Sequence, residues 1–297
     1  MSNPLTDFSN ALASAVEKGG ASTVLVDARK RYPASGIAYA EDLVLTADHV
    51  VTKEEIKILT PDGKTYSASV AGRDPGSDLA LLRLDEKVLA PAKTSSDIKV
   101  GQLVLALGRP NTAGMQASWG IVTAIAGPAR THRGGLLDEY INTETTPYPG
   151  FSGGPLVNTE GDVLGLNTSG LTQGSSLTIP VKVAWRIADE LAKHGSVKRG
   201  YLGVRTQPVE IPEATRKSLK REQVSGLLVV WLEEDGPAQK GGLFVGDTLV
   251  AVAAQPVSDP DDLFSALNSE TVGKSIPVEV LRGGKPETVN VIVGERK

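Results

Sequence analysis

The segment Gly150-Phe151-Ser152-Gly153-Gly154-Pro155-Leu156 contains the residues whose types and spacing most clearly could do chemistry. Glycines on both sides of a serine let the backbone turn so that successive N–H groups face one point, which is the geometry that a developing oxyanion needs. A serine hydroxyl in such a turn becomes a nucleophile when a neighbouring base takes its proton. Taken alone, the segment also fits a Gly-rich surface turn.

Two upstream residues could supply the base and its partner. His49 follows the apolar stretch Ile37–Leu45 and is one of three histidines in the chain. Asp78 precedes the apolar stretch Leu79–Leu84, where a buried carboxylate is costly unless a donor such as an imidazole N–H compensates it. A structural histidine and a turn-capping aspartate are the ordinary alternatives. In the order His49, Asp78, Ser152 the three residues nevertheless form a consistent set for acyl transfer.

The pattern Gly150-x-Ser152-x-Gly154 also fits the nucleophile elbow of α/β-hydrolases, with Asp162 or Asp189 followed by His194 as partners. That elbow requires a strand before the serine and a helix after it. Here the glycines lead into Leu156-Val157 and another strand, and no alternating βαβ pattern surrounds them. His194 is better explained as a cation near a helix C-terminus, and His132 as part of a polar loop.

The elements that must position these residues are mostly short strands. Turn signals separate the predicted strands, which favours antiparallel barrels or a sandwich. The predicted strands are Thr23–Val26, Ile37–Leu45, Ile56–Leu59, Leu79–Leu84, Leu103–Leu107, Trp119–Ile125, Val163–Leu166 and Leu177–Ile179. An amphipathic helix is predicted over residues 7–18, capped by Asp7 or Ser9, and another over residues 183–191 that stops at Gly195.

Composition excludes several classes of function. The 31 Lys and Arg against 35 Asp and Glu give a net charge of −4, so nucleic acid is not expected as a partner. The absence of Cys excludes disulfides and thiolate chemistry. The first residues show neither a basic cluster nor a continuous apolar region, and no apolar run could span a bilayer. A cytoplasmic location without a transmembrane segment is therefore predicted, with an extracytoplasmic location expected only if the chain is a processed fragment.

Four segments resemble the HtrA (Deg) type of trypsin-like serine protease with a C-terminal PDZ domain. They are Ser35-Gly36, Thr46 to Val50, Asp74 to Ala80 and Gly150 to Leu156, which match the family's patterns Ser-Gly, T-x-x-H-V, D-x-x-x-D-L-A and G-N-S-G-G-P-L. The resemblance implies a mostly β fold, in which a trypsin-like double β-barrel protease domain precedes a smaller α+β PDZ domain. The expected divisions are an N-terminal amphipathic segment (1–20), the protease domain (21–195), and a linker with the PDZ domain (196–297).

The resemblance also implies roles for individual residues. Ser152 would attack the peptide carbonyl, His49 would take and return the proton, and Asp78 would orient the imidazole. The backbone N–H groups of Gly150 and Ser152 would form the oxyanion hole. The expected substrate-binding residues are Thr146, Pro147, Tyr148, Asn167, Thr168 and Ser169. Because these two stretches carry no acid, small or medium apolar side chains are expected at the cleavage site.

The sequence departs from the family pattern at three places. Phe151 stands where the family often has Asn, and Thr145-Thr146-Pro147-Tyr148 replaces a run of small apolar residues and Asn. Asp48 directly precedes His49. These differences bear on substrate preference more than on the reaction.

In the second domain, Tyr201, Leu202, Gly203 and Val204 resemble the carboxylate-binding loop of PDZ domains, and Gly246-Asp247 lies within a second PDZ signature. A Gly between apolar residues lets consecutive N–H groups face a terminal carboxylate, while a free sheet edge accepts the peptide as an added strand. An ordinary edge strand is the alternative. The expected ligands are C-terminal peptides ending in apolar residues.

The resulting prediction is a serine endopeptidase that cleaves unfolded or misfolded proteins without ATP, cofactor or metal. A catalytically silent PDZ-bearing peptide binder or chaperone-like protein is the alternative. Members of the resembled family assemble as trimers through N-terminal segments, so a homotrimer is possible. The stripe around Phe8 and Leu12 could serve it, or could simply pack on its own barrel.

Overall fold

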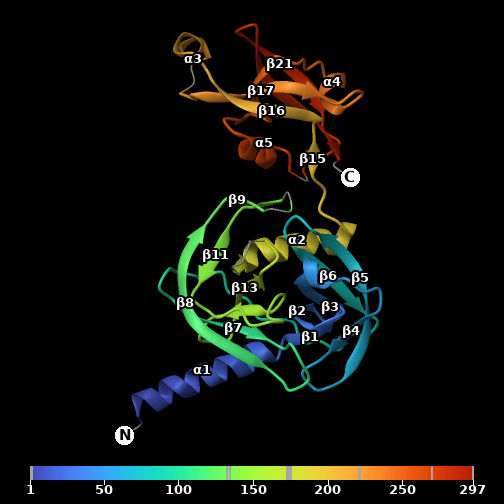
Figure 1. Ribbon diagram of the computed structural model, residues 1–297, viewed down its shortest axis with the longest axis vertical. Helices are drawn as coiled ribbons and strands as arrows, with labels where there is room; N and C mark the ends of the chain where they lie inside the picture. The colour runs from blue at the N-terminus through green and yellow to red at the C-terminus, as the bar shows by residue number, and fades with distance from the viewer. Residues whose placement is uncertain are drawn as a thin grey trace. The chain divides into compact units, whose positions relative to one another are not determined.

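The computed structural model describes residues 3–131, 133, 135–171, 176–219, 222–268 and 270–295. It divides into two compact units, Met1–Val197 and Lys198–Lys297 (Figure 1). The predicted polar-loop residue His132 lies outside the described residues.

The first unit begins with a closed antiparallel barrel in the strand order β1-β2-β3-β6-β5-β4. Its strands are β1 (Thr23–Asp27), β2 (Ala34–Ala40), β3 (Leu43–Ala47), β4 (Ile56–Leu59), β5 (Thr65–Asp74) and β6 (Leu79–Leu84). The single strand predicted over Ile37–Leu45 is wrong. A turn at Glu41-Asp42 divides it into β2 and β3, which pair with Ile37 opposite Leu45.

A second closed barrel follows in the order β11-β14-β13-β12-β7-β8. Its strands are β7 (Leu103–Gly108), β8 (Gln116–Ala126), β11 (Tyr140–Thr143), β12 (Pro155–Val157), β13 (Val163–Thr168) and β14 (Leu177–Pro180). A short ribbon of β9 (Ala129–Arg130) and β10 (Leu136–Leu137) leaves this barrel between β8 and β11. The two six-stranded barrels confirm the trypsin-like fold predicted for this part of the chain.

Alternate side chains of the central strands pack into two different cores. On β6, Ala80 and Leu82 point into the core of the first barrel, whereas Leu79 and Leu81 join a cluster that includes residues of β7 and β13. This alternation follows from the two-residue period of a strand, and it explains why β6 reads as a continuous apolar run. The shared cluster joins the barrels along the side where β3 ends and β6 begins.

Helix α2 (Val181–His194) covers this shared cluster with Val183, Ile187 and Leu191. Its end at Gly195, in the left-handed conformation with φ 74°, confirms the predicted stop. Helix α1 (Pro4–Gly20) is longer than predicted, and Asn3 caps it through a hydrogen bond from Leu5 N, instead of Asp7 or Ser9. Ala15 is buried, but the N-terminal half of α1 projects from the barrels (Figure 1).

The second unit is built around an antiparallel sheet in the order β16-β17-β18-β20-β21, with a short strand paired to β18. Its elements are β15 (Gly200–Tyr201), β16 (Val204–Glu210), α3 (Glu213–Leu219), β17 (Ser225–Leu232), α4 (Pro237–Lys240), β18 (Thr248–Val252), β19 (Gln255–Pro256), α5 (Pro260–Ala266), β20 (Ser275–Arg282), β21 (Lys285–Ile292) and β22 (Gly294–Glu295). Asp259 starts α5 with a capping box, as the Asp259-Pro260 pair suggests. One edge of the sheet, strand β16, has no neighbour beyond β17 among the described residues.

Candidate active site

His49 and Asp78 form a tightly coupled pair at the rim of the first barrel. His49 lies in the 3₁₀ turn that follows β3, and Asp78 lies immediately before β6. The imidazole Nδ1 is 2.8 Å from Asp78 Oδ2, and the backbone N–H of His49 donates to Oδ1 at 2.8 Å. Since a carboxylate accepts hydrogen bonds, Nδ1 carries the proton and Nε2 is left as the basic nitrogen.

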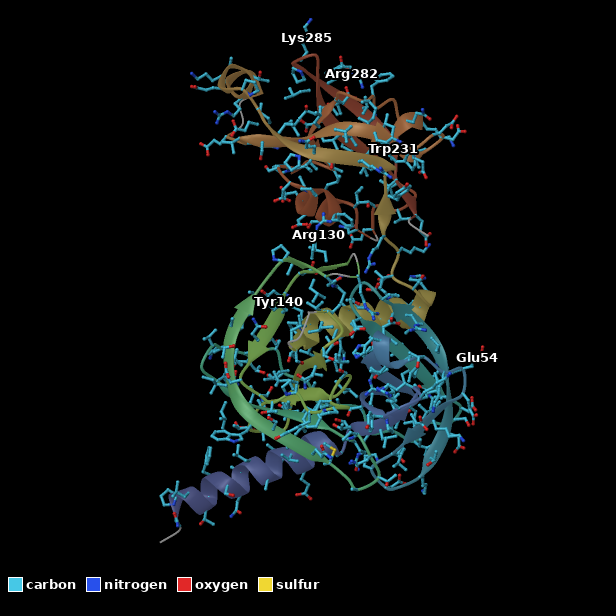
Figure 2. The ribbon with its side chains drawn as sticks, in the orientation of Figure 1. Glu54, Arg130, Tyr140, Trp231, Arg282 and Lys285 are labelled. Atoms are coloured by element: carbon cyan, nitrogen blue, oxygen red, sulfur yellow. The ribbon has the colours of Figure 1, made fainter. Side chains whose placement is uncertain are left out.

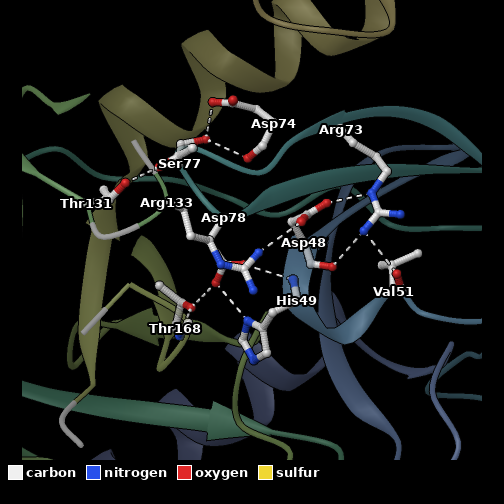
Figure 3. A network of polar contacts seen from close by, with 12 residues as sticks. Asp48, His49, Val51, Arg73, Asp74, Ser77, Asp78, Thr131, Arg133 and Thr168 are labelled. Atoms are coloured by element: carbon white, nitrogen blue, oxygen red, sulfur yellow. Dashed lines mark hydrogen bonds and ion pairs between the residues drawn. The ribbon is translucent and has the colours of Figure 1, made fainter. Parts of the chain in front are cut away.

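The Asp78 carboxylate is fully buried. Both of its oxygens accept hydrogen bonds. The Thr168 hydroxyl also donates to Oδ2 (Figure 3). The backbone of Asp78 adopts the left-handed conformation, with φ 56°, which Asp tolerates better than most residues. This conformation and the donors on both oxygens fix the carboxylate in front of the imidazole ring.

Ser152 lies in the loop between β11 and β12 of the second barrel. This loop lies next to the His49–Asp78 pair. Its Oγ is 3.2 Å from Ser169 Oγ, and it makes no hydrogen bond with His49 within the described part of the chain. A methyl group on Gly170, the residue after Ser169, would lie within 3.0 Å of His49 Nδ1 and of the Asp78 carboxylate. The stretch that follows β13 thus contacts all three residues and brings them into one site.

The loop around Ser152 leaves two backbone donors free. Phe151 N donates to Tyr148 O at 3.1 Å, Gly153 N to Asn167 O at 2.8 Å, and Gly154 N to Phe151 O at 2.8 Å. By contrast, the N–H groups of Gly150 and Ser152 donate no hydrogen bond to any residue that the structure describes. Gly150 has φ 89°, a conformation that favours glycine. These are the two N–H groups expected to bind an oxyanion.

Ser35 of β2 ties this loop to the first barrel. Its hydroxyl donates to Gly150 O at 2.7 Å and accepts from Arg109 N at 2.8 Å. Its backbone N–H donates to Ser152 O at 3.2 Å. The Ser-Gly pattern was noted in the sequence, but nothing there indicated that Ser35 would hold the carbonyls on both sides of Phe151.

An ion-pair network with a buried acid at its centre adjoins the His49–Asp78 pair (Figure 3). The side chain of Asp48 is only 4% exposed. Arg73 of β5 donates from Nε to its Oδ1 at 2.6 Å, and Arg133 donates from Nη1 to its Oδ2 at 3.2 Å. The same Arg133 nitrogen is 3.7 Å from Asp78 Oδ1. Asp48, which departs from the family pattern, therefore holds a guanidinium next to the carboxylate of Asp78.

Residues of the serine loop line two cavities, and most of the predicted substrate-binding residues line them too. One, of about 570 Å³, contains Pro147, Tyr148, Ser152 and Ser169 in its wall. The other, of about 250 Å³, is lined by Ala106, Thr143, Thr145, Pro147, Phe151, Asn167, Ser176, Leu177 and Thr178.

Two of the predicted substrate-binding residues line neither cavity. Thr168 is fully buried, so its hydroxyl supports the Asp78 carboxylate instead of touching substrate. Thr146 is exposed, and its N–H donates to Ser118 Oγ at 2.7 Å. The sequence alone could not separate these two from their neighbours: Thr168 ends β13, where the next residue points the other way, and Thr146 lies in a loop without a regular period.

In the second unit, the predicted carboxylate-binding loop lies between β15 and β16. Tyr201 donates from its hydroxyl to Glu233 Oε2 at 2.8 Å, and Gly203 has φ 74°. The carbonyls of Leu202 and Gly203 accept from Ala238 N and Glu233 N, both at 2.8 Å. The N–H groups of Leu202 and Gly203 donate no hydrogen bond to the residues described. Val204 opens edge strand β16, which packs against α5.

A double β-barrel with a His–Asp pair on one barrel and a serine loop on the other defines the class of trypsin-like serine peptidases. Residues 34–166 match the trypsin-like peptidase domain, and residues 200–293 match the PDZ domain. The structure resembles the HtrA-type protease AlgW with tripeptide, at a TM-score of 0.79 and 30% identity, over 96% of this chain and 97% of that chain. The chain belongs to the HtrA family of serine proteases.

Other similar proteins are also named serine endoproteases. The serine endoprotease from Yersinia pestis has a TM-score of 0.79 and 27% identity over 96% of this chain and 98% of its own. A probable periplasmic serine endoprotease, DegP-like, from Pseudomonas fluorescens is 37% identical over 87% of this chain and 55% of its own length. A relative of the same name from Halomonas elongata is 37% identical over 90% of this chain and 57% of its own. The chain thus spans little more than half the length of these curated relatives.

The predicted cytoplasmic location is wrong. The curated relatives are named periplasmic endoproteases, which points to an extracytoplasmic location. The prediction failed because it relied on the first residues of the given sequence alone. None of the helices described is both long and apolar enough to cross a membrane.

Proposed function

We propose that the chain is a serine endopeptidase whose acyl-enzyme chemistry is carried by Ser152, His49 and Asp78. The observation that carries the proposal is the combination of a buried, doubly hydrogen-bonded His49–Asp78 pair with a serine loop that keeps two N–H groups free. The catalytically silent alternative receives no support, since the curated relatives are named serine endoproteases.

Each group has a defined task in this reaction. Nε2 of His49 takes the proton from Ser152 Oγ as the hydroxyl attacks the peptide carbonyl, and it returns that proton to the leaving amine. Asp78 stabilises the imidazolium through its hydrogen bond to Nδ1. The N–H groups of Gly150 and Ser152 stabilise the oxyanion, and one such donor contributes about 3 kcal/mol to the transition state. Water then releases the acyl group by the same proton transfers.

Catalysis and peptide binding belong to two consecutive parts of the chain. Residues 21–195 form the catalytic part, and residues 196–297 bind the C-terminal carboxylate of a peptide through the free N–H groups of Leu202 and Gly203. The chain acts on unfolded or misfolded polypeptides, because a cleft between two barrels accepts an extended segment and not a folded one. The cavity of about 250 Å³, whose described lining contains no acid or base, receives a small or medium side chain at the cleavage site.

The direct test is cleavage of casein by the purified chain and by Ser152→Ala. The variant removes only the nucleophilic oxygen, so cleavage falls by about 10⁵-fold or more while the fold is kept. Circular dichroism and the melting temperature confirm the fold. Cleavage of casein by the variant at the parental rate refutes the assignment.

The chain assembles as a homotrimer through α1. Leu5 is 77% exposed and Phe8 46% exposed on this helix, whereas Ala15 packs against the barrels. Deletion of residues 1–10 is expected to convert a trimeric mass in light scattering into a monomeric one. A monomeric mass for the complete chain contradicts the proposal.

A further inference from the structure

The larger cavity beside Ser152 has a positively charged wall. Arg29, Lys30, Arg31 and Tyr32, from the connection between β1 and β2, line it together with Thr52. The rest of its wall consists of residues 147–152 with Ser169 and Ser176. Among the described residues, the lining thus contains three cations and no acidic residue. In a chain whose net charge is −4, this concentration of positive charge next to the nucleophile is unusual.

These three cations have no acidic partner among the residues that the structure describes. Arg29 donates from Nε to Tyr32 O and from Nη2 to Pro33 O at 3.3 Å, so only carbonyl groups hold it. Partial burial without a counter-charge lowers the pKa of its guanidinium. The nearby Asp27 is already paired with Lys53 at 2.8 Å. The wall is therefore short of negative charge, which a ligand could supply.

The position of the cavity indicates which part of a substrate would meet this wall. All residues that line the smaller cavity belong to the second barrel, and that cavity receives the side chain on the acyl side of the scissile bond. The cationic segment and Thr52 belong to the first barrel, which also carries His49. Because His49 returns its proton to the leaving amine, the leaving-group side of the substrate lies toward the first barrel.

We infer that this cavity is a subsite for carboxylate side chains of the substrate on the leaving-group side of the scissile bond. Asp or Glu within the first three residues after the cleaved bond supplies the counter-charge that Arg29, Lys30 and Arg31 lack. The inference rests on the proposed endopeptidase activity and adds a substrate class to it. A surface pair alone contributes little, but several charges that converge in a cleft act together and also speed association.

The experiment compares internally quenched peptides that share one cleavage site and differ in charge. One carries two Glu on the leaving-group side, one carries them on the acyl side, and one has Gln at all four positions. All have amidated C-termini, so that the second unit cannot capture them by a terminal carboxylate. The first peptide is expected to show roughly tenfold higher kcat/KM than the Gln peptide, and about 0.5 M salt should remove most of the gain.

Charge-removing variants locate the effect. Lys30→Gln/Arg31→Gln leaves the carbonyl contacts of Arg29 intact and is expected to reduce the preference for Glu to about threefold or less. The matched control Lys64→Gln/Lys99→Gln removes two exposed cations outside the cavity lining. It should keep the full preference. An equal rate for Glu and Gln peptides, or a gain only with Glu on the acyl side, overturns the inference.

Failure of this inference can be told from failure of the proposed activity. If the Gln peptide is cleaved but Glu brings no gain, the endopeptidase stands and the subsite falls. If no peptide is cleaved, fluorescence anisotropy with Ser152→Ala and the same peptides still measures binding. Tighter binding of the leaving-group Glu peptide then supports the subsite, and equal binding of all three overturns it.

Discussion

At the scale of single residues, the position of Asp78 defines the site. Its buried carboxylate receives the N–H of His49, the imidazole and the Thr168 hydroxyl, and Arg133 lies 3.7 Å away. An acid in front of an apolar strand was sufficient to predict the partner of His49. The other two contacts come from Arg133 and Thr168, which follow Asp78 by 55 and 90 positions in the sequence. No local pattern in the sequence could indicate them.

Gly170 is predicted to be indispensable, because a methyl group there collides with both His49 and Asp78. Gly170→Ala should displace the imidazole and reduce kcat/KM on a peptide substrate by about 100-fold, with little change in melting temperature. Gly63→Ala is the control for kinetics: its methyl group meets no atom within 4 Å, and the backbone strain at its φ of 83° lies in a turn between β4 and β5, so it should lower stability but leave kcat/KM unchanged. A Gly170→Ala enzyme with parental kinetics contradicts the described geometry.

Asp48 is predicted to stabilise the first unit because its buried carboxylate binds the partly exposed Arg73 and Arg133. Asp48→Asn removes the charge that both guanidinium groups share and should lower the free energy of unfolding by about 2 kcal/mol. The matched change Asp42→Asn breaks the more exposed pair with Arg83, at 2.9 Å, and should lower it by less than about 1 kcal/mol. Equal effects of the two changes in urea denaturation would show that the burial of Asp48 is unimportant.

At the scale of elements, continuous apolar patterns were predictable and mixed ones were not. Strands β6 and β13 bury nearly every side chain and were found, as was helix α2 with its glycine end. Strand β5 was missed, because most of its side chains are at least partly exposed and its sequence shows no apolar alternation. The three-residue β12 was noted only as a short apolar pair after the serine loop, because it is too short for its period to be recognised.

The second unit contains a bidentate pair that should make its stability depend on pH. Arg282, which is labelled in Figure 2, lies at the end of β20. It donates to both oxygens of buried Asp247 at 2.9 and 2.7 Å. Burial alone would raise the pKa of Asp247, but the hydrogen bonds from Arg282 and Phe244 N outweigh it and lower that pKa below 3.8.

A lowered pKa means that this pair stabilises the fold above the ordinary pKa of aspartate and loses its contribution as the pH falls below 3.8. Asp247→Asn should therefore lower the free energy of unfolding at neutral pH by about 2 kcal/mol, and the difference from the parental chain should shrink in acid. Denaturant titrations over a pH series measure this. The prediction is contradicted if the difference in unfolding free energy between Asp247→Asn and the parental chain stays constant as the pH falls below 3.8.

At the scale of the whole molecule, the order of motifs predicted a protease part followed by a peptide-binding part. The location predicted from the sequence was wrong, and the cation-lined cavity was not predicted at all. The cavity was missed because Arg29-Lys30-Arg31 looks like an ordinary solvated turn in the sequence. Only the folding of β1 and β2 into a barrel brings that turn to the wall that contains Ser152.

Peptide capture by the second unit is predicted to depend on a free C-terminal carboxylate. A peptide with an apolar C-terminal residue should bind roughly tenfold more tightly than its amidated form, because only the carboxylate can accept from Leu202 N and Gly203 N. Isothermal titration with the two peptides and Ser152→Ala protein measures the difference without cleavage. Equal affinity refutes carboxylate capture.

The most direct measurement for the whole account is covalent labelling by a fluorophosphonate, followed by peptide mapping. An activated serine with an adjacent base is predicted to give one adduct, on Ser152, and His49→Ala should slow its formation by about 1000-fold or more. The reaction is run with and without a peptide that has a free C-terminus, so that a resting form is also sampled. No adduct on Ser152 under either condition, or labelling of His49→Ala at the parental rate, would contradict the assignment of Ser152, His49 and Asp78.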